Sequence, residues 1–188
     1  MWCKMNIREL AMIIIFTALT VILLPRFSGI AVPSFIQGVP FQIWEIVVVT
    51  AFFLLRLKSA AAIALLITAV RLVASPGVPF ILPLSNLVAV LSTLLGIFLA
   101  YKLMVRKVPQ ETSTSGLKLA VSATMLGLTF RVGIMLAYLY TVAILLATPP
   151  RILYLYAFYD VIVALYTIPL GYLLAKFVNK NLKLNEKM

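Results

Sequence analysis

Four ionisable side chains, Glu45, Arg71, Arg131 and Asp160, lie inside stretches of sequence that are otherwise apolar enough to dissolve in lipid. Placing one charge at the centre of a bilayer costs at least about 2.5–3.5 kcal/mol on insertion scales. Two of the four are acidic and two are basic, so pairing can offset their charges. Charges retained at such a cost commonly bind substrates or move ions and protons, which makes these four the first candidates for a functional site.

The composition is that of an integral membrane protein. Of the 188 residues, 64% are hydrophobic and 11% are charged, whereas a soluble domain is about half apolar and about a quarter charged. The length allows about six crossings of ~20 residues each and leaves no room for a separate soluble domain. We therefore expect an all-α, polytopic protein of the cell membrane, with residues 1–188 forming a single six-helix transmembrane domain.

Several kinds of chemistry are excluded by what the chain contains. The net charge of +11 does not form a nucleic-acid-binding stripe, and membrane topology with anionic headgroups explains it. Cys3 is the single cysteine, which excludes an internal disulfide. The chain has no histidine, which excludes most zinc and haem sites and His-based acid–base chemistry. The sequence has no nucleophile elbow, Walker motif or His-Glu pair. We expect neither enzyme activity nor a metal or cofactor.

Six apolar segments predict the helices. They lie near 7–24, 41–57, 59–75, 82–105, 117–147 and 153–178. Prolines fall at several of the proposed ends, where a helix can stop without stranding backbone groups. The second and third segments are separated only by Arg56, Leu57 and Lys58, which predicts a tight antiparallel turn at the surface. Residues 25–40 and 74–86 are almost uncharged and rich in proline, glycine and aromatic residues, as suits outer loops that fold over a cavity.

Basic residues predict the orientation. With the N-terminus in the cytoplasm, all of the 16 lysines and arginines except Arg26, Arg71, Arg131 and Arg151 lie on cytoplasmic faces, which leaves twelve there. The positive-inside rule then predicts that both termini are cytoplasmic and that the number of spans is even. Residues 1–31 also resemble a secretory signal, but we expect them to provide the first transmembrane helix.

In this topology the four charges lie at different depths. Glu45 and Arg71 fall about one turn below the outer ends of the second and third helices, and Asp160 about two turns below that of the sixth. Arg131 lies near the midplane of the fifth. Three interpretations follow: structural ion pairs that join Glu45 to Arg71 and Asp160 to Arg131, a polar pocket open to the outside, or snorkelling of the charges nearest the interface. The uncharged outer loops favour the pocket.

Further candidates accompany these charges. Asn86 can give a ligand a directional hydrogen bond or act as an ordinary helix cap. Aromatic residues in the outer half can stack on a planar ring or form an interfacial belt. These are Phe35, Trp44, Phe80, Tyr138, Tyr140, Tyr156 and Tyr159, of which Tyr138 and Tyr156 are taken as substrate-binding candidates. Ala60 and Ala64 form a small-x-x-x-small pair, which lets another helix approach closely, either within the bundle or from a partner.

The whole pattern resembles a family, the substrate-binding S components of energy-coupling factor (ECF) vitamin transporters. The resemblance rests on the start IRELAMIIIFTALTVILLP, the tight turn between the second and third helices, and the stretches VPFILPLSNLVAVLSTLLGIFLAYKL and YDVIVALYTIPLGYLLAKF. The chain is most similar to the riboflavin-binding members, which begin their fourth helix in a comparable way. The resemblance implies capture of a vitamin, riboflavin first, in an outward pocket. It also implies delivery with a membrane coupling subunit and two cytoplasmic ATPases as partners.

The chain departs from the family pattern in its docking motif. The first helix of an S component usually carries an Ala-x-x-x-Ala motif for the coupling subunit. Here Ala11 and Ala18 lie two turns apart instead. Together with Ala60 and Ala64, they are the residues that we expect to take part in partner docking.

The chain also departs from the riboflavin pattern in its ligand residues. The sixth helix of the riboflavin type carries an asparagine and, three residues later, a lysine, and Asp160 and Val163 stand at these positions. Ala137 stands where the fifth helix has an asparagine, so Asn86 alone is retained. Asp160 can accept hydrogen bonds from a flavin, whereas Arg131 suits a carboxylate or phosphate, so another vitamin or an anionic precursor is an alternative ligand.

Two alternatives come from other classes of protein. A membrane-embedded enzyme acting on a lipid or isoprenoid would use Asp160 or Glu45 as its base, although the missing catalytic motifs argue against it. A stand-alone carrier or membrane scaffold would not associate with a coupling subunit and ATPases. Copurification therefore separates this last alternative from an S component.

Overall fold

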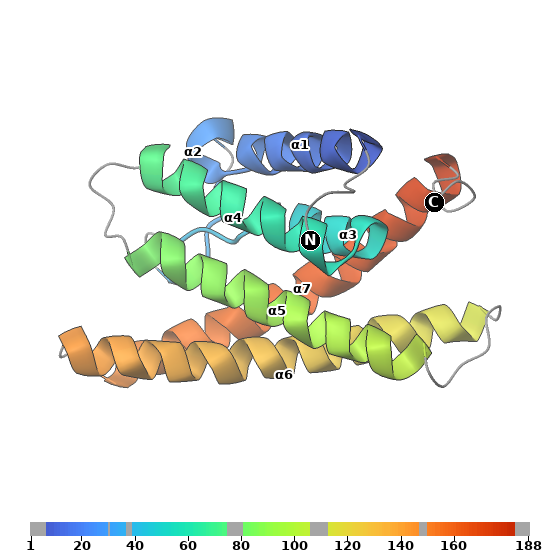
Figure 1. Ribbon diagram of the computed structural model, residues 1–188. Helices are drawn as coiled ribbons and strands as arrows, with labels where there is room; N and C mark the ends of the chain where they lie inside the picture. Colours follow the sequence, from blue (N-terminus) through green and yellow to red (C-terminus); the bar gives the residue numbers. More distant parts are fainter. Residues whose placement is uncertain are drawn as a thin grey trace.

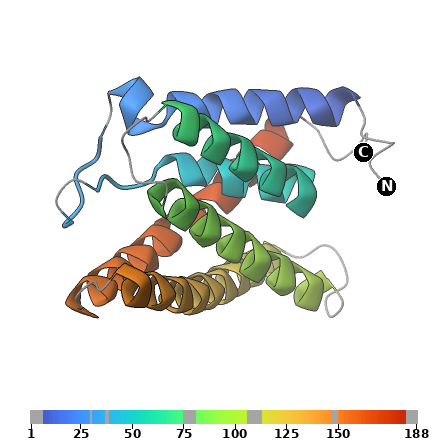
Figure 2. The same cartoon turned by 60° about the vertical axis from the view of Figure 1, so that its left-hand side comes forward.

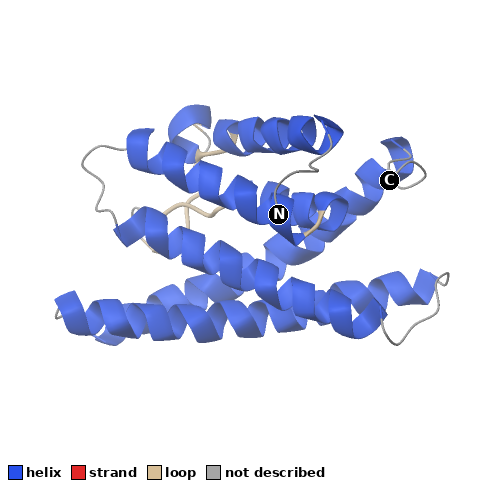
Figure 3. Cartoon of the chain, viewed as in Figure 1, coloured by secondary structure: helices blue, strands red, loops and turns tan. Residues whose placement is uncertain are grey.

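The computed structural model describes residues 7–29, 31–36, 39–74, 81–105, 113–146 and 150–182. Within these ranges the chain is helical with connecting loops, and no strand is present (Figure 3). The helices are α1 (Ile7–Ile22), α2 (Pro25–Ser28), α3 (Trp44–Leu55), α4 (Leu57–Ala74), α5 (Ile81–Val105), α6 (Ser113–Leu146) and α7 (Pro150–Leu182). The all-α prediction is confirmed for this part of the chain.

Each of the six predicted segments overlaps one of the longer helices, with ends that differ by up to four residues. The single turn α2 lies within the predicted first outer loop, where Pro25 occupies its first turn and Gly29 ends it with φ +67°. Helix α5 begins at Ile81, one residue before the predicted start of the fourth helix, so residues 81–86 of the predicted outer loop are helical. The remainder of that predicted loop, residues 75–80, lies outside the described residues.

The helices form two groups that share a boundary. Helices α1, α3 and α4 pack against one another, while α6 packs against both α5 and α7. Contacts of α3 with α7 and of α4 with α5 join the two groups. Figures 1 and 2 show α1 and α6 on opposite sides of the molecule, with α3 and α4 between them. Side chains near the start of α3 therefore reach the junction of the two groups.

Helix α3 shows how an apolar environment overrides local preference. Val47, Val48 and Val49 are followed by Thr50, a β-branched run that favours a strand in a half-exposed sheet. All four are buried and helical here. An α-helix satisfies every backbone group within its own segment, which is what a chain in lipid requires. Burial therefore decides the conformation, and the branched side chains fill the core.

The turn between α3 and α4 is even tighter than the sequence predicts. Arg56 is the single residue between the two helices, and its N–H donates to Phe52 O at 2.9 Å. Its φ of +84° is uncommon for a residue with a side chain. The exposed Arg56 ends α3 and lets α4 begin at Leu57, which sets the two helices antiparallel.

Glycines allow two close approaches between helices. A Cβ added at Gly96 of α5 would lie 2.5 Å from Leu126 O and 2.7 Å from Gly127 Cα, both backbone atoms of α6. A Cβ added at Gly171 of α7 would lie 2.6 Å from Val49 Cγ1 of α3. Small residues let helices in a membrane approach and gain van der Waals contact, and these two positions fix the α5–α6 and α3–α7 spacings.

In the described part of the chain, four helices are long and apolar enough to cross a membrane. The candidate spans are Leu57–Ala74, Leu82–Met104, Gly116–Leu145 and Tyr154–Asn181. Helix α3 is apolar but has 12 residues, about 18 Å of helix at 1.5 Å per residue. The hydrocarbon core is about 30 Å thick, so α3 alone does not span it. The structure thus describes a helical protein with several membrane-compatible helices.

Candidate functional site

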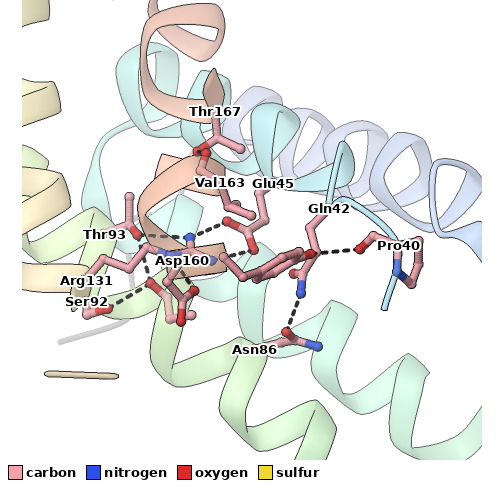
Figure 4. Close-up of polar contacts among 12 residues, drawn as sticks. Pro40, Gln42, Glu45, Asn86, Ser92, Thr93, Arg131, Asp160, Val163 and Thr167 are labelled. Carbon is pink, nitrogen blue, oxygen red and sulfur yellow. Dashed lines mark hydrogen bonds and ion pairs between the residues drawn. The ribbon is translucent and has the colours of Figure 1, made fainter. Parts of the chain in front are cut away.

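Three of the four charges meet inside the helix bundle (Figure 4). Arg131 of α6 is fully buried and donates from Nε to Asp160 Oδ1 of α7 at 2.8 Å. Its two terminal nitrogens donate to Glu45 of α3, Nη1 to Oε2 at 2.5 Å and Nη2 to Oε1 at 3.2 Å. We call Glu45, Arg131 and Asp160 the charge triad.

The site draws on a fourth helix. Thr93 of α5 lies 3.3 Å from Arg131 Nη1 as a hydrogen-bond acceptor, and its own hydroxyl donates to Ala89 O at 2.8 Å. The planar guanidinium carries donors in a fixed fork, which suits it to hold two carboxylates and a hydroxyl at once. One side chain near the middle of α6 therefore ties α3, α5 and α7 together.

Arg71 completes the charge balance without joining the triad. Its guanidinium carbon lies 5.7 Å from the centre of the Trp44 ring, a cation–π distance. It is also close enough to Glu45 for an electrostatic interaction. The triad alone carries two negative charges and one positive charge. Since Arg71 adds the second positive charge, the four side chains together are neutral.

This arrangement corrects one predicted ion pair. Glu45 pairs with Arg131 and not with Arg71, whereas the predicted pair of Asp160 with Arg131 is confirmed. The depth of Glu45 near the start of α3 suggested Arg71 of the adjacent helix as its partner. The long Arg131 side chain reaches both carboxylates from the middle of α6, and Arg71 stacks on Trp44 instead.

Aromatic residues of the loop before α3 cover α7 next to the triad. Phe41 stacks on Tyr159 with ring centres 5.8 Å apart and 9° between the planes. Phe35 meets Phe158 and Tyr159 at 5.4 and 6.2 Å. The Tyr159 hydroxyl donates to Pro40 O at 2.7 Å, which anchors the loop backbone to the helix that carries Asp160. We call Phe35, Phe41, Phe158 and Tyr159 the aromatic cap.

An amide pair lies at the edge of the same region. Gln42 Nε2 donates to Asn86 Oδ1 at 2.6 Å and joins the loop before α3 to the first turns of α5 (Figure 4). The predicted candidate Asn86 therefore belongs to the site's surroundings, and its side chain bonds a residue that the sequence reasoning missed. Gln42 had one recognisable signal, since it is an uncharged polar residue three positions before Glu45 in an apolar segment.

The other aromatic candidates are more peripheral or lie elsewhere. Tyr138 is half-buried and receives a hydrogen bond from Ser85 at 3.4 Å, while Tyr156 is half-buried on α7. Tyr140 is exposed, and Phe80 lies outside the described residues. Phe41, Phe158 and Thr93 are not recognisable as site residues from the sequence, because aromatic and hydroxyl residues are frequent throughout apolar helices.

The small-residue candidates divide between the inside and the outside of the bundle. Ala60 and Ala64 are buried, so they serve internal packing rather than a free docking face. Ala11 and Ala18 are exposed on α1. Large apolar side chains of the same helix, among them Ile14 and Ile15, are exposed as well. Of the four predicted docking residues, the two on α1 are therefore accessible.

Comparisons with protein-family models, with curated proteins and with solved structures find no match to this chain.

Proposed function

We propose that this chain is the substrate-binding membrane subunit of an ECF-type importer. In this proposal it crosses the cell membrane six times, with both termini in the cytoplasm, and captures a vitamin, riboflavin first, from the outside. A membrane coupling subunit and two cytoplasmic ATPases complete the importer. The sequence resemblance supplies the transport role, and the architecture of the charge triad supplies the support for a binding site.

The observation that carries the proposal is the placement of the triad beside non-helical backbone. Glu45 lies in the first turn of α3, and residues 39–43 before it are not helical. At the depth of a membrane, such backbone is stable only where protein buries it or where it lines a cavity. Tyr159 satisfies Pro40 O in this stretch.

The state of the carboxylates favours binding over catalysis. A general base must be free to take a proton from its substrate. Glu45 and Asp160 are both buried and both held by Arg131. The triad therefore suits a rigid floor beneath a ligand better than the acid–base pair of a lipid-modifying enzyme. The aromatic cap adds flat apolar rings beside the triad, the kind of surface on which a ring-shaped vitamin stacks.

Ligand release tests the proposal directly. The protein is expressed in cells grown with riboflavin, purified in detergent and denatured, and the supernatant is analysed by absorbance and mass spectrometry. We expect about one flavin per chain, and none from a mock purification of cells that lack the protein. If no vitamin is released and none binds on titration, the proposed function is wrong.

Coexpression tests the transport role separately. The chain is produced together with the coupling subunit and ATPases encoded by its source organism. We expect these proteins to copurify and to give ATP-dependent uptake. The exposed face of α1 with Ala11 and Ala18 is the proposed contact surface, so Ala11→Trp should weaken copurification without affecting ligand release. Ile144→Trp, at an exposed position of α6 to which no role is assigned, is the matched control.

A further inference from the structure

Buried polar side-chain atoms without a hydrogen-bond partner occur at the start of α3 and elsewhere in the described part of the chain. Among the described residues, such side-chain atoms are Thr17 Oγ1, Gln42 Oε1, Arg71 Nη1, Tyr166 Oη and Asn179 Oδ1. Nearly all buried polar groups in proteins are paired, so each unpaired one calls for an explanation. An explanation for Gln42, Arg71 and Tyr166 is that a ligand completes their hydrogen bonds.

These three residues gather around the start of α3. Gln42 precedes Trp44 by two positions, and the Arg71 guanidinium lies over the Trp44 ring. Tyr166 meets Phe41, the neighbour of Gln42, with ring centres 6.0 Å apart. One acceptor and two donors, from the loop before α3, from α4 and from α7, thus lie around the start of α3.

The charge balance restricts what these groups can bind. Arg131 is already engaged by two carboxylates and Thr93, so an added anion would meet Glu45 and Asp160 as like charges. A carboxylate bound to Arg71 would compete with Glu45 and leave the buried cluster with a net negative charge. An uncharged ligand keeps the four charges balanced and can still complete all three hydrogen bonds.

Building on the proposed function, we infer that Gln42, Arg71 and Tyr166 form hydrogen bonds with the ligand. Together they select an uncharged molecule with adjacent hydrogen-bond donors and acceptors. A lactam, imide or carboxamide edge has this character. The triad holds the site in shape and does not itself bind a carboxylate or phosphate, so an anionic precursor is disfavoured as the substrate.

Matched pairs of compounds test the charge selectivity. Binding to purified protein is measured by titration for riboflavin against flavin mononucleotide, nicotinamide against nicotinate, and pyridoxal against pyridoxal phosphate. In whichever pair binds, we expect the uncharged member to bind at least tenfold more tightly. Equal or tighter binding of the anionic member overturns the inference and leaves the proposed capture of a vitamin standing.

Tyr166→Phe tests whether the Tyr166 hydroxyl binds the ligand, with little change in the shape of the side chain. It keeps the ring contact with Phe41 and removes the unpaired hydroxyl, so we expect about 3- to 10-fold weaker binding of the compound that binds the unaltered protein. The melting temperature without ligand should be unchanged or higher, because a buried unpaired group is lost. Tyr101→Phe, on the exposed end of α5, is the control and should alter neither property.

The outcomes separate the two proposals. Unchanged affinity in Tyr166→Phe, or a loss of affinity that follows a lower melting temperature, overturns the inference alone. Failure of every compound to bind the unaltered protein overturns the proposed function, and the inference falls with it.

Discussion

Arg131 holds two carboxylates at once, so its removal and the removal of one partner have different consequences. Arg131→Met leaves Glu45 and Asp160 buried without their counter-charge, and we expect it to lower the free energy of unfolding by about 3–5 kcal/mol. Asp160→Asn keeps an oxygen that can accept a hydrogen bond from Arg131 Nε. It should therefore lower the free energy of unfolding clearly less than Arg131→Met does. Denaturant titration in mixed micelles measures both. Lys176→Met, at an exposed position, is the control.

The opposite order of these two variants would contradict the geometry. If Asp160→Asn destabilised the protein as much as Arg131→Met, the bond between Arg131 and Glu45 would not hold α6 to α3 as described. Binding measured on folded Asp160→Asn then shows whether the triad also shapes the ligand site.

Tyr159 makes one polar contact that can be removed separately from its ring contacts. Tyr159→Phe loses the hydrogen bond to Pro40 O and keeps the stacking on Phe41. We expect a loss of about 0.5–1.5 kcal/mol in the free energy of unfolding, typical of one neutral hydrogen bond. Hydrogen exchange should become faster at the amide of Phe41, which bonds Val32 O in the same loop.

The matched control is Tyr154→Phe, because Tyr154 is exposed on the same helix. Exchange at Phe41 that stays as slow as in the unaltered protein would show that the aromatic contacts alone hold the loop.

Sequence alone identified the charged residues of the site but not all of their partners. Charge inside an apolar stretch is a strong signal, because its energetic cost is large. The sequence is a weaker guide to which charged residues pair, since pairing depends on where a long side chain ends rather than on where its Cα lies. Arg131 reaches Glu45 from the middle of α6, which depth along each helix did not reveal. Gln42 and Thr93 are uncharged, so their signals were weaker still.

At the scale of the helices, the contact of α5 with α6 depends on Gly96. A Cβ at this position would meet backbone atoms of α6, which cannot rotate away as a side chain can. We therefore expect Gly96→Ala to force the helices apart and to cost about 1–3 kcal/mol, the usual penalty of overpacking. Thermal unfolding in detergent measures the loss.

Gly133 on α6 supplies the matched control. A Cβ there would meet nothing within 4 Å. Since alanine favours a helix over glycine by about 0.5–1 kcal/mol, Gly133→Ala should leave stability unchanged or raise it. Equal destabilisation by both variants would mean that helix flexibility, and not the close approach at Gly96, is what the glycines provide.

The helices themselves were predictable because long apolar runs in lipid have few alternatives to a helix. The ends of the helices were less predictable. Helix α3 begins at Trp44, three residues later than predicted, because residues 41–43 form a loop that bonds to Val32 and lies against Tyr159. The turn α2 was missed since Pro25 reads equally well as a helix stop and as the first residue of a new helix.

The arrangement of the whole molecule could not be predicted from the sequence. In a soluble bundle the apolar stripe of each helix shows which face is inside. Here both the lipid-facing and the core-facing sides are apolar: Leu165 and Leu173 of α7 are exposed, while Val163 and Ile168 of the same helix are fully buried. Two features indicate that α3 packs against α7. Arg131 of α6 binds a carboxylate from each of these helices, and Gly171 of α7 lets Val49 of α3 approach closely.

The orientation proposed for the molecule can be tested with thiol labelling. Cys3 is the single cysteine, so a membrane-impermeant maleimide applied to intact cells reports its location without any substitution. If the N-terminus is cytoplasmic, Cys3 should react only after the membrane is permeabilised. In a Cys3→Ser background, Val32→Cys, on an exposed position of the loop between α2 and α3, should react in intact cells.

The C-terminus decides whether the number of crossings is even. Met188→Cys in the same background should behave as Cys3 does and stay protected in intact cells, because six crossings return the chain to the side on which it began. Of the helices that the structure describes, four have the length of a span, and α1 and α3 are shorter. If either short helix does not cross, the count becomes odd, and Met188→Cys would react in intact cells while Cys3 does not. If neither crosses, Cys3 and Met188→Cys would again agree, but Val32→Cys would then be protected with them.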